Sequence, residues 1–288
     1  MPQDRRAFLS SLGAAAVSLA YGCTPFGGAR PGSGARPKQT KLGIQLYTLR
    51  TVAAKDLGGT LARLATIGYK EIEFAGYYNH PAAEVRAMLD RYGLSAPSAH
   101  IDMAQLEGEA AATTYQDAKT IGLEWVTVPS LPRGRRDTVD DWKRLAQQFN
   151  AVAADARAQG FRFAYHNHNT EFRKVDGAVP LEILLGETNP SLVSFEMDVY
   201  WVVNGGANPI DLLTRYPGRF KMLHLKDSMG PPEHKMADVG AGTIDFKAIL
   251  ARADGIEHYF VEHDSPADPF ASAAASYSYL SKVLPLTA

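Results

Sequence analysis

The sequence predicts an α/β fold, a single (β/α)8 barrel of the TIM-barrel class, on three observations. Short apolar segments with strand character alternate with helical segments from residue 41 to residue 288. The strand–helix units recur at spacings of roughly 25 to 40 residues, which suits a barrel of about 250 residues. No GxGxxG motif follows the first strand, which argues against a doubly wound dinucleotide-binding sheet.

The predicted strands are short apolar runs, several of which alternate with a period of two. Phe161, Phe163 and Tyr165 show this alternation, and Gly160 precedes them. Residues at alternate positions of a strand share one face, so such a run places its apolar side chains together. The predicted strands are 42–47, 70–74, 95–100, 125–128, 161–166, 192–198, 220–225 and 258–262.

The predicted helices have apolar residues at helical spacing, and glycines mark several of their ends. Gly68, Gly93 and Gly122 each follow such a stretch, as expected where a helix stops. The predicted helices are 57–67, 81–92, 110–121, 140–159, 179–186, 209–216, 246–253 and 268–284. Each predicted strand is therefore followed by a helix, as in a single barrel.

The first thirty residues resemble a twin-arginine export signal. Arg5 and Arg6 precede the weakly apolar run Leu12–Ala20, an arrangement typical of such signals. An ordinary amphipathic helix after a basic N-terminus is the alternative. We therefore expect export to the periplasm, with the twin-arginine translocase as a partner.

Cys23 is the single cysteine and follows the apolar run directly. Its context resembles a bacterial lipoprotein cleavage site, so we expect either a lipid anchor at Cys23 or simple cleavage nearby. A single cysteine also forms no internal disulfide. Residues 31–40 belong to a stretch rich in Gly, Pro and Arg and are predicted to be a flexible tether, which leaves 41–288 for the barrel.

Composition points to a small neutral ligand. The 288 residues have a net charge of −1, which gives no electrostatic reason to expect nucleic acid or an anionic membrane as a partner. Beyond the N-terminus no apolar run approaches the roughly 18 residues of a membrane-spanning helix. A neutral small ligand fits this composition better, and the sequence leaves the oligomeric state open.

Polar residues close most of the predicted strands, and in a (β/α)8 barrel the carboxyl ends of the strands form the active-site face. The richest stretch, FRFAYHNHNTEF, spans residues 161–172. The polar residues expected at this face are Gln45, Tyr47, Glu73, His100, His166, Asn167, His168, Glu171, Asp198, His224, Lys226, Asp227, Glu262, His263 and Asp264.

Several of these residues are typical metal ligands. Buried carboxylates and imidazoles are costly to desolvate unless something pairs them, and a divalent cation would do so. Asp198, His224 and Glu262 are the strongest candidates, with either His166 or Glu171 as the fourth ligand. Mixed ligation of this kind suits Mn²⁺, Mg²⁺, Co²⁺ or Zn²⁺. The alternatives are a helix cap for Asp198, a core position for His224 and a surface position for Glu262.

The remaining residues of this face are expected to contact substrate. Lys226 would neutralise a developing enolate, or else form a salt bridge with Asp227. Glu73 and His100 would hydrogen-bond sugar hydroxyls, or else serve packing. Trp201 would stack on the face of a sugar, or else only line the cavity. The expected substrate-binding residues are Gln45, Tyr47, Glu73, His100, Asn167 and Trp201.

The sequence resembles the sugar phosphate isomerase/epimerase superfamily, the xylose isomerase-like TIM barrels. The matching segments are 43–47 (GIQLY), 68–73 (GYKEIE), 165–168 (YHNH) with Glu171 and Phe172, Asp198, 224–227 (HLKD), 239–246 (VGAGTIDF) and Glu262. The resemblance implies one divalent metal held by Glu, Asp, His and Glu from the fifth to eighth strands. His166 stands where the fifth-strand Glu is expected, as in a YHNH-motif branch that includes relatives of inosose dehydratases.

The resemblance implies an isomerase or epimerase that acts on a keto-sugar or polyol through an enediolate. Glu262 or Glu171 would be the base, and His168 or Lys226 the partner acid. Because the fifth-strand Glu is replaced, a lyase that eliminates from a keto-sugar or its glycoside through the same intermediate is the alternative. Further alternatives are an exported sugar-binding protein without catalysis, an apurinic endonuclease and a metal-free structural protein.

Overall fold

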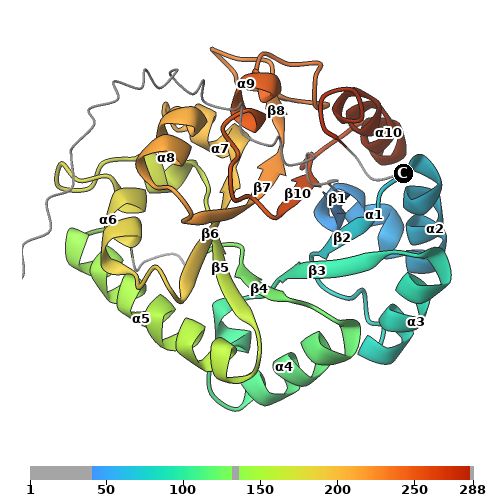
Figure 1. The fold of residues 1–288 in the computed structure, drawn as a ribbon, viewed down its shortest axis with the longest axis horizontal. Coiled ribbons are helices and arrows are strands. Elements are labelled where there is room, and N and C mark those ends of the chain that lie inside the picture. Colours follow the sequence, from blue (N-terminus) through green and yellow to red (C-terminus); the bar gives the residue numbers. More distant parts are fainter. Residues whose placement is uncertain (1–40, 132–135, 286–288) are drawn as a thin grey trace, which may run out of the picture. The chain divides into compact units, whose positions relative to one another are not determined.

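The computed structural model describes residues 41–131 and 136–285. Within them, parallel strands close into a barrel in the order β1-β10-β7-β6-β5-β4-β3-β2 (Figure 1). The predicted fold class is confirmed. The barrel strands are β1 (Leu42–Gln45), β2 (Glu71–Phe74), β3 (Ser95–His100), β4 (Trp125–Val128), β5 (Arg162–His166), β6 (Val193–Asp198), β7 (Phe220–Leu225) and β10 (His258–Val261).

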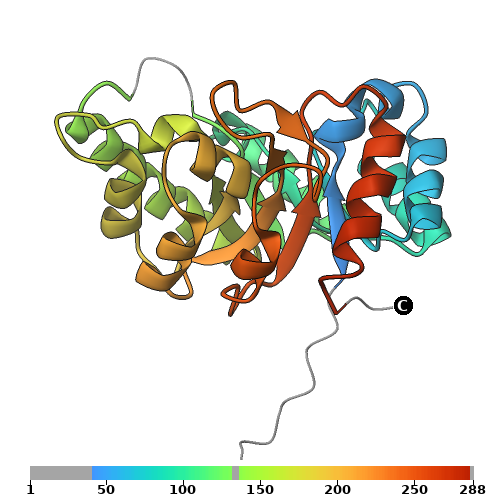
Figure 2. The ribbon, with the colours of Figure 1, turned by 90° about the horizontal axis from the view of Figure 1, so that it is seen from above.

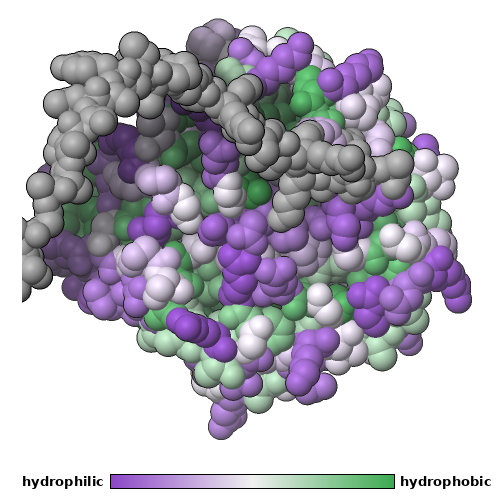
Figure 3. Space-filling view, in the orientation of Figure 1, coloured by the Kyte–Doolittle hydropathy of each residue, from purple (hydrophilic) through white to green (hydrophobic). Residues whose placement is uncertain are grey.

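Helices surround the barrel, as Figures 1 and 2 show. Hydrophilic side chains gather near the middle of the face drawn in Figure 3. Each main helix turns buried apolar residues toward the strands, for example Leu57, Leu61 and Leu64 of α2. The helices are α1 (Arg50–Ala53), α2 (Leu57–Ile67), α3 (Ala82–Tyr92), α4 (Ala110–Ile121), α5 (Val139–Ala158), α6 (Pro180–Glu187), α7 (Val199–Asn204), α8 (Pro209–Arg215), α9 (Phe246–Leu250) and α10 (Pro269–Leu280).

The structure differs from the predicted elements mainly at the carboxyl ends of strands. The strand predicted to reach Tyr47 ends at Gln45, whose side chain accepts a hydrogen bond from Tyr47 N and starts the 3-10 helix η1 (Leu46–Leu49). Helix α7 and the small hairpin of β8 (Asp227–Ser228) and β9 (Met236–Ala237) were not predicted. These departures all lie near the face where the polar residues gather.

The predicted export signal at 1–30, the tether at 31–40 and the lipid site at Cys23 lie outside the described residues. Within the described part of the chain, every helix is too short or too polar to cross a membrane.

The barrel interior changes from apolar to polar along each strand. Trp125, Ala164, Met222 and Phe260 form a buried apolar cluster. Because side chains alternate along a strand, the residues two positions later face the same interior; these are Thr127, His166, His224 and Glu262. The apolar cluster therefore closes the interior on one side of the polar residues. We call it the apolar floor.

Candidate metal centre

Four side chains from consecutive barrel strands converge at the carboxyl ends of those strands. His166, Asp198, His224 and Glu262 are all buried, and each offers one ligand atom within 4.8 Å of the others. His166 Nε2 lies 3.4 Å from Asp198 Oδ2, and His224 Nδ1 lies 2.9 Å from Glu262 Oε2. We call these four residues the cluster. It holds the three strongest ligand candidates of the sequence together with His166.

Two buried atoms of the cluster are suited to bind a cation. His166 Nε2 and Asp198 Oδ2 make no hydrogen bond among the described residues. Their contacts are ion-pair contacts, with each other at 3.4 Å and from Asp198 Oδ2 to Lys226 Nζ at 3.0 Å, and a cation between them would give both a ligand bond. The other oxygen of Asp198 caps α7 by accepting a hydrogen bond from Trp201 N at 3.0 Å. Asp198 is thus both a helix cap and a cluster member. A ligand set of two imidazoles and two carboxylates is typical of sites for Zn²⁺, Mn²⁺ or Co²⁺, which bind nitrogen ligands more readily than Mg²⁺ does.

Lys226 supplies positive charge beside the cluster. Its Nζ lies 3.0 Å from Asp198 Oδ2, 2.8 Å from Glu262 Oε2 and 2.8 Å from Asp264 Oδ1. Burial opposes ionisation of Glu262, but the charges of Lys226 and His224 outweigh it and hold its pKa well below the usual value. Glu262 is therefore a carboxylate at neutral pH, able to accept a proton.

Lys226 does not pair with Asp227, which was the alternative interpretation of this residue. Both oxygens of Asp227 are occupied by backbone N–H donors of the segment that follows it. These donors are the amides of Ser228, Gly240, Gly242 and Ile244, at 2.7 to 3.2 Å. Asp227 is therefore an anchor for this segment, and Lys226 is directed to the cluster.

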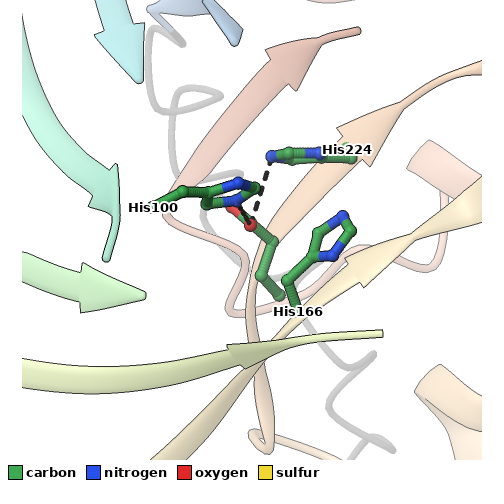
Figure 4. Close-up of side chains that lie close together, drawn as sticks. His100, His166 and His224 are labelled. Atoms are coloured by element: carbon green, nitrogen blue, oxygen red, sulfur yellow. Dashed lines mark hydrogen bonds and ion pairs between the residues drawn. The ribbon is translucent and has the colours of Figure 1, made fainter. Parts of the chain in front are cut away.

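A second set of buried polar groups lies against the cluster. Glu73 Oε2 is 2.6 Å from His224 Nε2, and Glu196 Oε2 is 2.9 Å from His100 Nε2. Figure 4 shows His100, His166 and His224 close together, with interactions between residues of this group drawn as dashed lines. Glu196 Oε2 also lies 3.1 Å from His224 Nε2, and Glu73 Oε2 lies 3.4 Å from His100 Nε2. The two imidazoles therefore share the two carboxylates.

An open cleft of about 460 Å³ leads to the cluster. Tyr47 lines this cleft, and 42% of its surface is exposed. Cavities of this size accommodate small ligands. The residues that line the cleft are Tyr47, Ala75, Gly76, His100, Asp102, Gln105, Pro129, Ser130, His166, His168, Lys226, Glu262 and Asp264.

Glu171 lies apart from the cluster and the cleft lining. Its Oε1 accepts a hydrogen bond from Tyr165 OH at 2.6 Å, and its Oε2 accepts from His168 N and Thr170 Oγ1, each at 2.9 Å. This carboxylate therefore stabilises the 3-10 helix η3 (Asn169–Phe172). The geometry favours His166 over Glu171 as the fourth ligand and leaves Glu171 without access to a substrate in the cleft.

Three of the expected substrate-binding residues instead support their neighbours. The Gln45 amide donates to Glu73 at 2.8 Å. Asn167 brackets the backbone of Asp198, because its Oδ1 accepts from Asp198 N and its Nδ2 donates to Asp198 O. The Trp201 ring lies 5.5 Å from Lys226 Nζ, outside the cleft lining. Of the six residues expected to bind substrate, Tyr47 and His100 line the cleft.

His168 lines the cleft as a neutral imidazole. Burial, with the neighbouring charge of His166, lowers the pKa of His168 to about 3. Its ring centroid lies 5.5 Å from that of Trp201. At neutral pH His168 is not an imidazolium and has no acidic proton to donate. Lys226 therefore fits the role of the partner acid better.

Two further groups of this site were given no role from the sequence. Alternation places Glu196 on the same face of β6 as Asp198, but the sequence favours Asp198, at the strand end, as the ligand. The pairing of Glu196 with His100 depends on the closure of the barrel and leaves no trace in either local sequence. Asp264, which was expected at this face without a role, lines the cleft and binds Lys226.

Comparison with known proteins identifies the family. The family model described as "Xylose isomerase-like TIM barrel" matches residues 61–280. The chain belongs to this family, in agreement with the resemblance in its strand-end motifs. A curated relative, an inosose dehydratase of Lacticaseibacillus casei, is 30% identical over 165 residues, which cover 50% of this chain and 55% of the relative. The chain thus spans about half the length of that relative.

Solved structures agree on the fold. A sugar phosphate isomerase/epimerase from Parabacteroides distasonis is 28% identical, with a TM-score of 0.76 over 88% of this chain and 97% of that chain. The IolI protein with a zinc atom is 16% identical, with a TM-score of 0.67 over 85% of this chain and 98% of that chain. The relatives are enzymes of one superfamily with both dehydratases and isomerases or epimerases among their names.

Proposed function

We propose that the protein is a metal-dependent lyase of the dehydratase type, acting on a keto-sugar or a cyclic polyol ketone. The observation that carries this proposal is the Glu262 carboxylate. It lines the cleft, belongs to the cluster and lies 2.8 Å from the Lys226 ammonium. A base and a cation side by side in a cleft suit removal of a proton from carbon.

The first step is transfer of a proton from the carbon beside the substrate carbonyl to Glu262. The pKa of Glu262, held below its usual value by Lys226 and His224 in spite of burial, keeps this carboxylate ionised at neutral pH. The Lys226 ammonium stabilises the negative charge that develops on the substrate oxygen. A divalent cation held by His166, Asp198, His224 and Glu262 would add Lewis-acid polarisation of the carbonyl.

The arrangement of bases favours elimination over epimerisation. Epimerisation needs a second base to return the proton to the opposite face of the carbon, and Glu171 has both oxygens occupied by hydrogen bonds. In elimination one base is enough: the C–H electron pair forms a C=C bond and the adjacent C–O bond breaks. The departing hydroxyl takes a proton from Lys226 and leaves as water. The inosose dehydratases among the relatives support this choice.

An isomerase or epimerase is the second candidate. It would share the proton abstraction by Glu262 and the enediolate, and it would return the proton to a neighbouring carbon instead of expelling a hydroxyl. The Parabacteroides structure favours this candidate because its description is an isomerase/epimerase.

Solvent deuterium exchange tests the proposal. Purified protein loaded with Mn²⁺ is incubated in D₂O with a panel of keto-sugars and inososes, and NMR follows both exchange at carbon and loss of water. We expect exchange in the wild type and a loss of about 10²-fold or more in Glu262→Gln. Glu257→Gln, a carboxylate at the other end of the barrel paired with Arg162, is the matched control and keeps wild-type exchange.

The outcomes separate the candidates. Dehydrated product identifies the lyase, and exchange with rearranged but not dehydrated product identifies the isomerase. Wild-type exchange in Glu262→Gln would remove Glu262 from the mechanism. Metal-loaded protein that exchanges no substrate of the panel would favour a sugar-binding protein instead.

A further inference from the structure

Carboxylates contact both nitrogens of the His224 ring. Its Nδ1 is 2.9 Å from Glu262 Oε2, and its Nε2 is 2.6 Å from Glu73 Oε2. Both carboxylates and the imidazole are buried. From this arrangement we propose that Glu73 is a positioning residue: it accepts the Nε2–H of His224 and makes Nδ1 the nitrogen that binds the cation. The inference rests on the cation site of the proposed function.

The Nδ1 side of the ring is the side that faces the cluster. Lys226 Nζ is within 3.0 Å of both Asp198 Oδ2 and Glu262 Oε2, so the two cluster carboxylates lie beside the same point. Glu262 Oε2 is also the atom next to His224 Nδ1. A cation shared by Asp198, Glu262 and His224 is therefore reached from Nδ1.

A neutral imidazole has one N–H and one lone pair, so fixing the proton on Nε2 frees Nδ1 as a ligand. Glu73 is suited to hold that proton because its carboxylate is itself fixed. Its Oε2 accepts from Gln45 Nε2 at 2.8 Å and its Oε1 accepts from Ser98 Oγ at 2.6 Å. Metal-binding histidines commonly donate their second N–H to such a carboxylate, which sets the tautomer and the ring orientation.

Glu196 also faces Nε2 of His224, at a greater distance. Its Oε2 lies 3.1 Å from His224 Nε2 and 2.9 Å from His100 Nε2. Glu73 Oε2, at 2.6 Å, is the nearer carboxylate oxygen to His224 Nε2 and is the one we assign as the acceptor of the Nε2–H. The apolar floor closes the interior beyond these groups, so the positioning carboxylates stay in a buried setting where their hydrogen bonds are strong.

Metal affinity of Glu73→Gln, with Glu71→Gln as the matched control, tests the inference. Glu71 lies two residues earlier on β2, is also buried, and also contacts a histidine, His258, at 2.8 Å. Competition with a chelating dye measures the affinity of each full-length variant for Zn²⁺ and Mn²⁺. We expect Glu73→Gln to weaken binding by about 10- to 100-fold and Glu71→Gln to change it by less than about 2-fold.

A second measurement reads the tautomer directly and needs no variant of Glu73. Long-range ¹H–¹⁵N spectra of the Zn²⁺-loaded wild type, with His224→Asn used for assignment, are expected to show His224 with the proton on Nε2 and the metal on Nδ1. Ser98→Ala, which loosens Glu73 but keeps its charge, is expected to weaken metal binding by a smaller factor than Glu73→Gln.

The results distinguish this inference from the proposed function. Unchanged affinity in Glu73→Gln, equal weakening in Glu71→Gln, or a metal on Nε2 of His224 would overturn the positioning role while the cation site stands. A wild type that binds neither Zn²⁺ nor Mn²⁺ would overturn the proposed function itself.

Discussion

At the scale of single residues, the site depends on how burial and neighbouring charges set protonation. Glu262 and His168 line the same cleft, and both have their pKa lowered, for opposite reasons. Glu262 is held ionised by Lys226 and His224 in spite of burial, whereas burial holds His168 neutral. One side chain is therefore ionised at neutral pH, and the other contributes a neutral polar surface to the cleft.

The lowered pKa of His168 predicts that the free energy of unfolding decreases in acid. Its pKa is lowered from 6.5 to about 3 in the folded state. Between these values the unfolded chain binds a proton that the folded chain excludes, so the free energy of unfolding falls as pH decreases. The contribution of this group has a slope of at most about 1.4 kcal/mol per pH unit. In His168→Gln we expect that part of the slope to disappear in urea unfolding of metal-free protein.

The same experiment contains its own control. Above pH 7.5 His168 is neutral in both folded and unfolded chains, so wild type and His168→Gln are expected to share one pH dependence there. An identical slope for the two proteins between pH 6.5 and pH 4 would show that His168 is protonated in the folded state.

At the scale of elements, the segment after β7 is organised by Asp227. This buried carboxylate holds backbone amides from residues 228 to 244. The segment starts directly after Lys226, and it approaches Asp227 so closely that a Cβ on Gly242 would lie 2.3 Å from Asp227 Oδ1. Asp227 therefore connects the position of Lys226 to the fold of the loop.

Replacing Asp227 is expected to destabilise this element strongly. Asp227→Ala leaves several buried or half-buried N–H groups without acceptors, and we expect the free energy of unfolding to fall by at least about 2 kcal/mol. Asp245→Ala is the comparison, since Asp245 only caps α9 through Ala248 N, and its loss costs about 1 kcal/mol. Urea unfolding measures both. A smaller effect in Asp227→Ala than in Asp245→Ala would contradict the anchoring role.

Local sequence predicted the regular elements because their causes are local. Alternation along 161–166 and glycine after the helix at 57–67 reflect contacts and caps within a few residues, and β5 and α2 formed there. The elements that were missed depend on side-chain hydrogen bonds. Gln45 ends β1 by binding Tyr47 N, and Asp198 starts α7 by capping Trp201 N. The sequence assigned Gln45 only to the site, whereas a helix cap was the stated alternative for Asp198, and both residues also turn the backbone.

The site was predictable only where strand position decides it. Asp198, His224 and Glu262 end strands of one barrel, so topology alone brings them together. The states of Glu171 and Glu196 are decided by partners that the local pattern does not specify. Tyr165 and Thr170 engage Glu171, while His100, from the far side of the barrel, engages Glu196.

At the scale of the whole molecule, closure of the barrel creates the site. Asp198 is in register with His224 on the neighbouring strand, and Phe260 is in register with His224 on the other side. The same closure packs Gly43 of β1 against Phe260, where a Cβ would lie 2.4 Å from the ring. The apolar floor and the cluster are thus consecutive layers of one interior.

The central claim is that His166, Asp198, His224 and Glu262 bind one divalent cation. An anomalous difference map from crystals of the full-length protein soaked in Zn²⁺ tests it most directly. We predict one peak about 2.0 to 2.2 Å from His166 Nε2, Asp198 Oδ2, His224 Nδ1 and Glu262. A fully soaked crystal with no peak at these atoms, or with the peak at Glu171, would contradict the account.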